Sequence, residues 1–189
     1  MPESVLKKAG AEILDYHGTG MSVMEMSHRS AAFQEIFDST KAALRAALNV
    51  PDSHEILFLQ GGATLQFAAI PMNLMRGGAA DYAVTGNFSG KAAREAAKYG
   101  GVHIAADTSS TGHDRIPAQQ ELAESADAKY FYYCANNTIY GTEWQYVPEV
   151  HSPLVCDMSS DILSKPVDVA KYGLIYAGAQ KNMAPAGLT

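Results

Sequence analysis

The chain has 189 residues, a net charge of −6 at pH 7, and 47% apolar against 18% charged residues. This composition excludes wholesale disorder, and the negative charge leaves no basic face for nucleic acid. The N-terminus does not resemble a signal peptide, and no apolar segment is long enough to span a bilayer. Both cysteines lie in apolar runs, as expected of free thiols in a reducing cytosol. We therefore expect a single cytoplasmic domain.

The first half of the chain contains clear helical patterns. A proline opens a predicted helix over residues 2–14, and apolar residues recur at helical spacing over residues 30–48, where Pro51 closes the segment. Residues 55–60 (EILFLQ) hold four consecutive apolar residues, which is typical of a strand covered on both faces. A further helix is predicted over about residues 65–75, despite Pro71.

The second half alternates between strands and helices. Helical stretches are predicted at residues 91–99 and around residues 118–125. Because strands that alternate with helices pair in parallel through right-handed crossovers, the predicted fold class is a layered α/β domain. The strands of this half are predicted at residues 81–85, 102–106, 129–135, 153–157 and 174–177.

Polar clusters follow five of the predicted strands at the point where each strand ends. In an open parallel sheet, ligands bind beyond the carboxyl ends of the strands. We therefore predict one site at that edge, built from the loops GGAT (61–64), GNFS (86–89), NNT (136–138), DMSS (157–160) and GAQK (178–181).

The chemistry of these loops suits one cofactor. The glycines of GGAT leave backbone N–H groups free at a positive helix end, where a phosphate can bind, although a tight turn is the plainer explanation. Lys181 can form a Schiff base with an aldehyde, although a solvated surface lysine is the plainer explanation. Asp157 ends an apolar strand, so its carboxylate either has a partner or caps a helix. Phe88 on its loop either stacks on a planar ring or packs. Pyridoxal phosphate needs a lysine, an acid and an anion site.

A family resemblance supports this interpretation. YGLIYAGAQKNMAPAGLT, with VCDMSSDILSKPVDVAKYG before it, resembles the cofactor-lysine region of the phosphoserine aminotransferases, which are fold-type I, class V pyridoxal-phosphate enzymes. MEMSHRS, LFLQGGATLQFAAIPMNL, ADYAVTGNFSGKAAREAAKYG and NNTIYGTEW match further family blocks in the family's order, so the resemblance covers almost the whole chain. It implies a three-layer large domain with a mostly parallel central sheet, of which residues 1–189 are a part that is incomplete at both ends.

The resemblance also implies roles for individual residues. Lys181 corresponds to the lysine of the internal aldimine, and Asp157 corresponds to the partner of the pyridinium nitrogen. His28 and Arg29 match the pair that contacts the substrate's phosphate. The remaining residues correspond to positions around the cofactor's phosphate (Ala63, Thr64 and Gln180), ring face (Phe88) and phenolic oxygen (Thr138).

The implied reaction transfers an amino group from L-glutamate to 3-phosphohydroxypyruvate and gives O-phospho-L-serine and 2-oxoglutarate. It belongs to serine biosynthesis, with the phosphohydroxythreonine step of pyridoxine biosynthesis as a further option, and the family's enzymes are homodimers with a shared active site. The alternatives are a related fold-type I enzyme, such as a serine–pyruvate type transaminase or a cysteine desulfurase, and a non-catalytic fragment that binds the cofactor.

The chain departs from the family pattern in three respects. Phe88 stands where many members have tryptophan, and Ala63 and Thr64 replace a longer glycine run with a basic residue. The family's opening segment and its C-terminal small domain are absent from the sequence. The remaining histidines are scattered without ligand spacing, so we expect no metal site.

Overall fold

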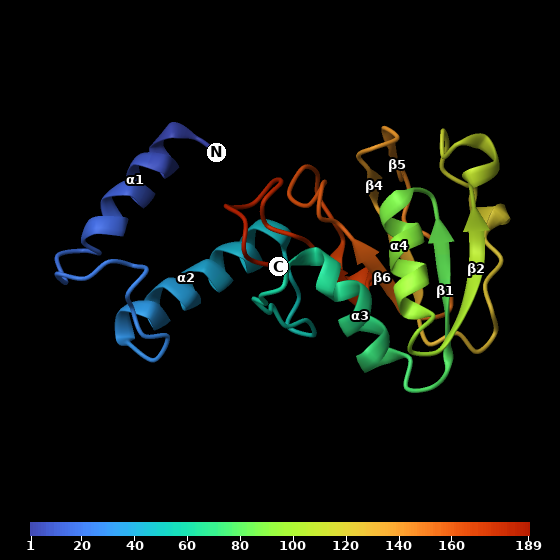
Figure 1. Ribbon diagram of the computed structural model, residues 1–189, viewed down its shortest axis with the longest axis horizontal. Coiled ribbons are helices and arrows are strands. Elements are labelled where there is room, and N and C mark those ends of the chain that lie inside the picture. Colours follow the sequence, from blue (N-terminus) through green and yellow to red (C-terminus); the bar gives the residue numbers. More distant parts are fainter. The chain divides into compact units, whose positions relative to one another are not determined.

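A computed structural model describes all residues from 1 to 189, and the chain forms two compact units, Met1–Asp52 and Ser53–Thr189 (Figure 1). The first unit holds helices α1 (Glu3–Leu14) and α2 (Ala31–Leu48), which confirms both predicted helices. Ser30 caps α2 because its side chain accepts a hydrogen bond from the Phe33 N–H. No helix of the chain is both long and apolar enough to cross a membrane.

The second unit is built on a five-stranded sheet with the strand order β2-β1-β3-β6-β7, in which all neighbouring strands are parallel. A separate antiparallel pair, β4 (Asn136–Asn137) and β5 (Thr142–Glu143), follows β3. The parallel α/β class is therefore confirmed. The five strands of the sheet are β1 (Ala79–Val84), β2 (Gly101–Asp107), β3 (Phe131–Cys134), β6 (Leu154–Asp157) and β7 (Leu174–Tyr176).

Two helices, α3 (Gly62–Leu74) and α4 (Asn87–Ala96), pack with the sheet around the main hydrophobic core. In Figure 1, α4 lies beside β1 and runs roughly along it. Small residues on α4 let the helix approach the sheet closely, and large tyrosines on the strands fill the space between the layers. Buried core members include Phe67, Ile70, Ala92, Ala93, Ala96, Tyr82, Tyr132, Val155 and Tyr176.

The predicted strand at residues 55–60 is wrong. Leu57 and Leu59 are 68% and 42% exposed, so the segment is not covered on both faces. Leu59 and Thr189 exchange two backbone hydrogen bonds of 2.8 and 2.9 Å. The segment is part of neither sheet.

The predicted helix around residues 118–125 is also wrong. A 3-10 turn, η2 (Gln119–Glu121), is all that forms there. The backbone of the next residues turns toward the sheet, because the Ala123 N–H donates to the Ala105 carbonyl on β2 at 2.8 Å. Tertiary hydrogen bonding therefore overrides the local helical pattern.

Candidate active site

The loops that follow the strands meet at the carboxyl edge of the sheet, as the sequence predicts. The side-chain amide of Asn137 donates to Thr85 at 3.2 Å, which joins the loops after β3 and β1. The Gly178 N–H donates to the Ser159 hydroxyl at 3.1 Å and thereby joins the loops after β7 and β6. These contacts join the four loops in two neighbouring pairs.

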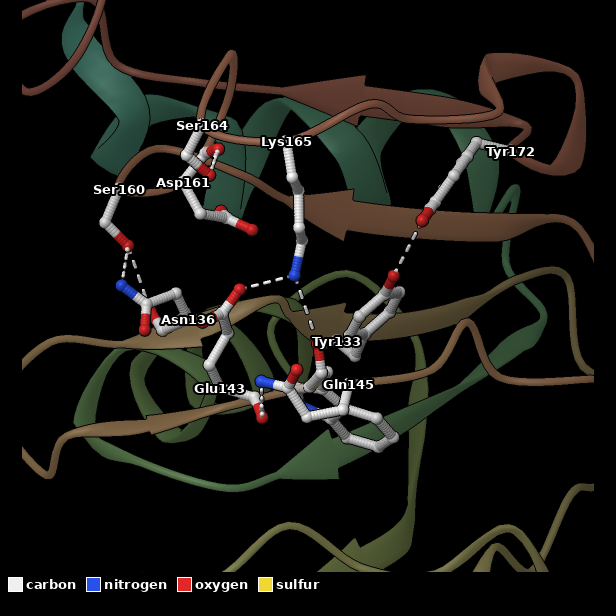
Figure 2. Close-up of polar contacts among 10 residues, drawn as sticks. Tyr133, Asn136, Glu143, Gln145, Ser160, Asp161, Ser164, Lys165 and Tyr172 are labelled. Atoms are coloured by element: carbon white, nitrogen blue, oxygen red, sulfur yellow. Dashed lines mark hydrogen bonds and ion pairs between the residues drawn. The ribbon is translucent and has the colours of Figure 1, made fainter.

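The short β4–β5 hairpin is tied to the turn after β6 by side chains on both segments (Figure 2). The Asn136 amide donates to the Ser160 hydroxyl at 3.0 Å, and Lys165 forms an ion pair with Glu143. The exposed Thr138 lies in the loop of this hairpin, between β4 and β5. The hairpin is therefore held by the same turn that begins at Asp157.

Lys181 lies beside Phe88 at this rim. Its ammonium nitrogen is 5.5 Å from the centre of the Phe88 ring, and the nitrogen of Lys91 lies 5.6 Å from the same centre. The loop of Lys181 is anchored, because the neighbouring Asn182 amide donates to the Ile162 carbonyl at 2.7 Å. Phe88 lies in the first turn of α4, whereas the sequence placed it on a loop, because α4 begins at Asn87.

Asp157 is a buried carboxylate whose two oxygens both accept hydrogen bonds. Its side chain is 5% exposed. Oδ1 accepts from the Ser159 N–H and Oδ2 accepts from the Tyr176 hydroxyl, both at 2.9 Å. Turns follow Asp157, so it does not cap an α-helix. The carboxylate is fixed on two sides at the end of β6.

The N-terminus of α3 is open to a ligand. Gly61 and Gly62 have φ values of 96° and 67°, and no side chain caps the helix. The backbone N–H groups of the first turn therefore lack helical partners and lie at the positive end of the helix dipole. A side chain at Gly62 would meet no atom within 4 Å, which indicates open space beside these donors.

Ala63 and Gln180 both lie against Gly178. A methyl group placed on Gly178 would be 3.4 Å from the Ala63 side chain and 3.0 Å from the Gln180 side-chain oxygen. The start of α3 and the loop after β7 are therefore neighbours. Thr64, one residue further along α3, is exposed.

The structure thus brings seven of the predicted residues to one rim. His28 and Arg29 belong to the other compact unit, where both are exposed in the turn before α2. The Arg29 N–H donates to the Ser27 hydroxyl at 3.2 Å. Their role in substrate binding remains a prediction. The rim residues are Ala63, Thr64, Phe88, Thr138, Asp157, Gln180 and Lys181.

Sequence reasoning missed the polar partners of Asp157. It identified neither Tyr176 nor the link between Ser159 and Gly178. Tyr176 lies opposite Asp157 in the parallel register of β6 and β7. The sequence does contain a signal, since a strand LIY beside a strand LVCD can place a tyrosine next to the aspartate. Reading that signal requires the register in which the two strands pair.

The cysteines are not candidate nucleophiles. Cys134 and Cys156 are both buried and free. Burial raises the pKa of each thiol well above its ordinary value, so both remain neutral. They act as core residues.

A parallel sheet with a lysine, a fixed carboxylate and an open helix N-terminus along its carboxyl edge is an arrangement suited to a phosphate-bearing carbonyl cofactor. The family model described as aminotransferase class-V matches residues 1–189, and the chain belongs to that family.

Among known proteins, the chain is similar to phosphoserine aminotransferases. It is 52% identical over 190 residues to the one from Laribacter hongkongensis, an alignment that covers 100% of this chain and 53% of the relative. The solved phosphoserine aminotransferase of Bacillus circulans subsp. alkalophilus matches with a TM-score of 0.96 and 44% identity, and the pyridoxal-phosphate-bound one of Trichomonas vaginalis with 0.92 and 40%. Each match covers 100% of this chain and 53% of the solved chain, so the chain spans about half the length of these relatives.

Proposed function

We propose that the chain forms the cofactor-binding part of a pyridoxal-phosphate-dependent aminotransferase that converts L-glutamate and 3-phosphohydroxypyruvate into 2-oxoglutarate and O-phospho-L-serine. Membership of the class-V family and the similarity to phosphoserine aminotransferases support this reaction. The observation that carries the proposal is the position of Lys181 beside Phe88, on the rim that also holds Asp157.

The residues present fit pyridoxal phosphate. The exposed amine of Lys181 is available to an aldehyde, and the half-buried ring of Phe88 offers a stacking surface beside it. The uncapped first turn of α3, with open space at Gly62, can hold a phosphate. Asp157 retains lone pairs beyond its two hydrogen bonds and can accept one from a ring nitrogen.

Each residue then has a defined task. The cofactor, when bound, supplies a ring that accepts the electrons left after a proton leaves the substrate's Cα. Lys181 would hold the cofactor's aldehyde through its Nζ, and its free amine would serve as the base and acid that moves the proton at the substrate's Cα. Asp157 would hold the proton on the ring nitrogen. Ala63 and Thr64 would bind the phosphate through their N–H groups, with Gln180 beside them, and Thr138 would interact with the phenolic oxygen.

Substrate selection is assigned to the first unit. Arg29 offers a planar fork of donors that matches phosphate oxygens, and His28 adds a second donor. Because a non-phosphorylated substrate has no need of this pair, we favour the phosphorylated oxo acid over the substrates of related class-V enzymes. The phosphohydroxythreonine step of pyridoxine biosynthesis is a second use of the same chemistry.

The setting of the reaction follows from the same proposal. Both compact units belong to one large cofactor-binding domain of a cytoplasmic enzyme of serine biosynthesis. The enzyme acts as a homodimer with a shared active site.

The direct test replaces Lys181. In Lys181→Ala, the long-wavelength absorbance of the bound cofactor and its trapping by borohydride should both disappear, because no amine remains to hold the aldehyde. Lys91→Ala is the matched control, since Lys91 lies at nearly the same distance from Phe88 and should leave trapping intact. Trapping that persists on another lysine in Lys181→Ala would show that the assignment is wrong.

A further inference from the structure

Asp157 lies at the end of a chain of three buried side chains. The Tyr176 hydroxyl donates to Asp157 Oδ2 at 2.9 Å, and the hydroxyls of Tyr132 and Tyr176 are also 2.9 Å apart. Tyr132, Tyr176 and Asp157 are 1%, 7% and 5% exposed. The chain crosses three neighbouring strands, since β6 lies between β3 and β7.

The direction of these hydrogen bonds is fixed by the number of protons. Tyr176 has one hydroxyl hydrogen, which it gives to Asp157, so the hydrogen between the two tyrosines must come from Tyr132. Burial raises the pKa of both hydroxyls well above the ordinary value, so both keep their hydrogens at working pH. Both O–H dipoles therefore point toward the carboxylate.

Two other buried tyrosine pairs show that this arrangement is particular. The hydroxyls of Tyr133 and Tyr172 are 3.0 Å apart (Figure 2), and those of Tyr82 and Tyr130 are 2.6 Å apart. Neither pair donates to a carboxylate. In those two pairs, each hydroxyl serves as the hydrogen-bond partner of the other. The Tyr132–Tyr176 pair differs because Tyr176 also donates to the Asp157 carboxylate.

A buried carboxylate gains more from such donors than an exposed one. Removing it from water is costly unless donors replace the lost hydration, and a hydrogen bond to a charged acceptor is about twice as strong as a neutral one. Successive hydrogen bonds that point the same way also strengthen one another. The tyrosine pair therefore stabilises the carboxylate in one orientation.

We propose that Tyr176 and, behind it, Tyr132 are positioning residues that hold the Asp157 carboxylate in a fixed orientation as the partner of the cofactor's ring nitrogen. The proposal rests on the proposed function. Neither tyrosine touches the reacting atoms, and each acts through Asp157.

The experiment measures the dissociation constant of pyridoxal phosphate for the cofactor-free protein, together with kcat and KM for glutamate. Tyr176→Phe should bind the cofactor about tenfold to hundredfold more weakly, as expected for the loss of a hydrogen bond to a charge. Its kcat should fall while KM for glutamate stays within about twofold, because no substrate contact is lost. Tyr132→Phe should show a smaller loss of about threefold.

Tyr133→Phe is the matched control. It removes a hydroxyl from a buried pair of similar length, on the same strand and next to Tyr132, and should leave cofactor binding unchanged. The double variant Tyr132→Phe/Tyr176→Phe should be no worse than Tyr176→Phe, because Tyr132 acts only through Tyr176. If Tyr176→Phe does not fold, Tyr132→Phe against Tyr133→Phe carries the test.

The outcomes separate the two proposals. Cofactor binding in Tyr176→Phe equal to that in Tyr133→Phe, or independent additive losses from Tyr132 and Tyr176, would overturn the positioning role while leaving the proposed function intact. An unsubstituted protein that does not bind the cofactor at all would overturn both.

Discussion

The two edges of the sheet carry positive charge in different surroundings. At the carboxyl edge, Lys181 lies over an aromatic ring, and side-chain hydrogen bonds join the loops after β1, β3, β6 and β7. At the amino edge, Arg76 and Lys129 line a cavity of about 340 Å³ whose other walls are Leu74, Pro153, Val155 and Gly173. That cavity has neither a carboxylate nor an aromatic ring among its lining residues. Positive charge and a cavity alone therefore do not identify an active site. The carboxyl edge is distinguished by an aromatic ring and a carboxylate that lie on the same rim as the lysine.

The largest effect is expected at the carboxylate of the carboxyl edge. Asp157→Asn should lower kcat by about hundredfold to thousandfold, because a neutral amide does not stabilise a proton on the ring nitrogen. Lys129→Ala at the amino edge is the comparison and should leave kcat within about twofold. Steady-state transamination of glutamate measures both, and comparable losses in the two variants would remove the distinction between the edges.

A smaller and more selective effect is expected from the first unit. Arg29→Ala should raise KM for the phosphorylated substrate by about tenfold to hundredfold, because a charge-assisted contact to phosphate is lost. Glutamate, which has no phosphate, should be affected far less. Steady-state kinetics with each substrate varied in turn distinguishes the cases, and equal losses for both would count against a phosphate-binding role.

The smallest effect concerns stability at the carboxyl edge. Burial raises the pKa of Asp161 from 3.8 to about 6, opposed in part by Lys165. The folded protein therefore binds the Asp161 proton more tightly than the unfolded chain does. The stabilisation that this proton gives is complete below about pH 4 and is lost as the pH rises through about 6.

Asp161→Asn should remove this dependence. The fall in unfolding free energy between pH 4 and pH 7 should become smaller by about 1 to 2 kcal/mol, less than the full shift implies because part of the group is screened by water. Thermal unfolding at both pH values measures it, with the exposed Asp127→Asn as control. An unchanged pH dependence in Asp161→Asn would mean that its carboxyl is not perturbed.

Much of the fold was predictable because local patterns determine it. Short apolar runs identified all five strands of the parallel sheet, an opening proline indicated α1, and helical spacing identified α2. Residues 55–60 have the same apolar pattern as those strands, yet they remain outside the sheet, because pairing partners are a tertiary property. The β4–β5 hairpin was missed because strands of two residues are too short to show alternation.

The rim was predictable for a topological reason, since parallel strands end at one edge. What the sequence could not supply was register. On β3, the hydroxyl of Tyr132 meets Tyr176, which donates to Asp157, whereas the hydroxyl of the next residue, Tyr133, meets Tyr172. A shift of one residue in the register would exchange these two sides of the sheet. The partners that fix the candidate site therefore became visible only in three dimensions.

The central claim is that Lys181 is the amine that holds pyridoxal phosphate. The most direct measurement is borohydride reduction of the cofactor-loaded protein, followed by proteolysis and mass spectrometry of the modified peptide. We predict one modified peptide, which carries the reduced cofactor on Lys181. Modification of Lys91 or of another lysine, with Lys181 unmodified, would contradict the account.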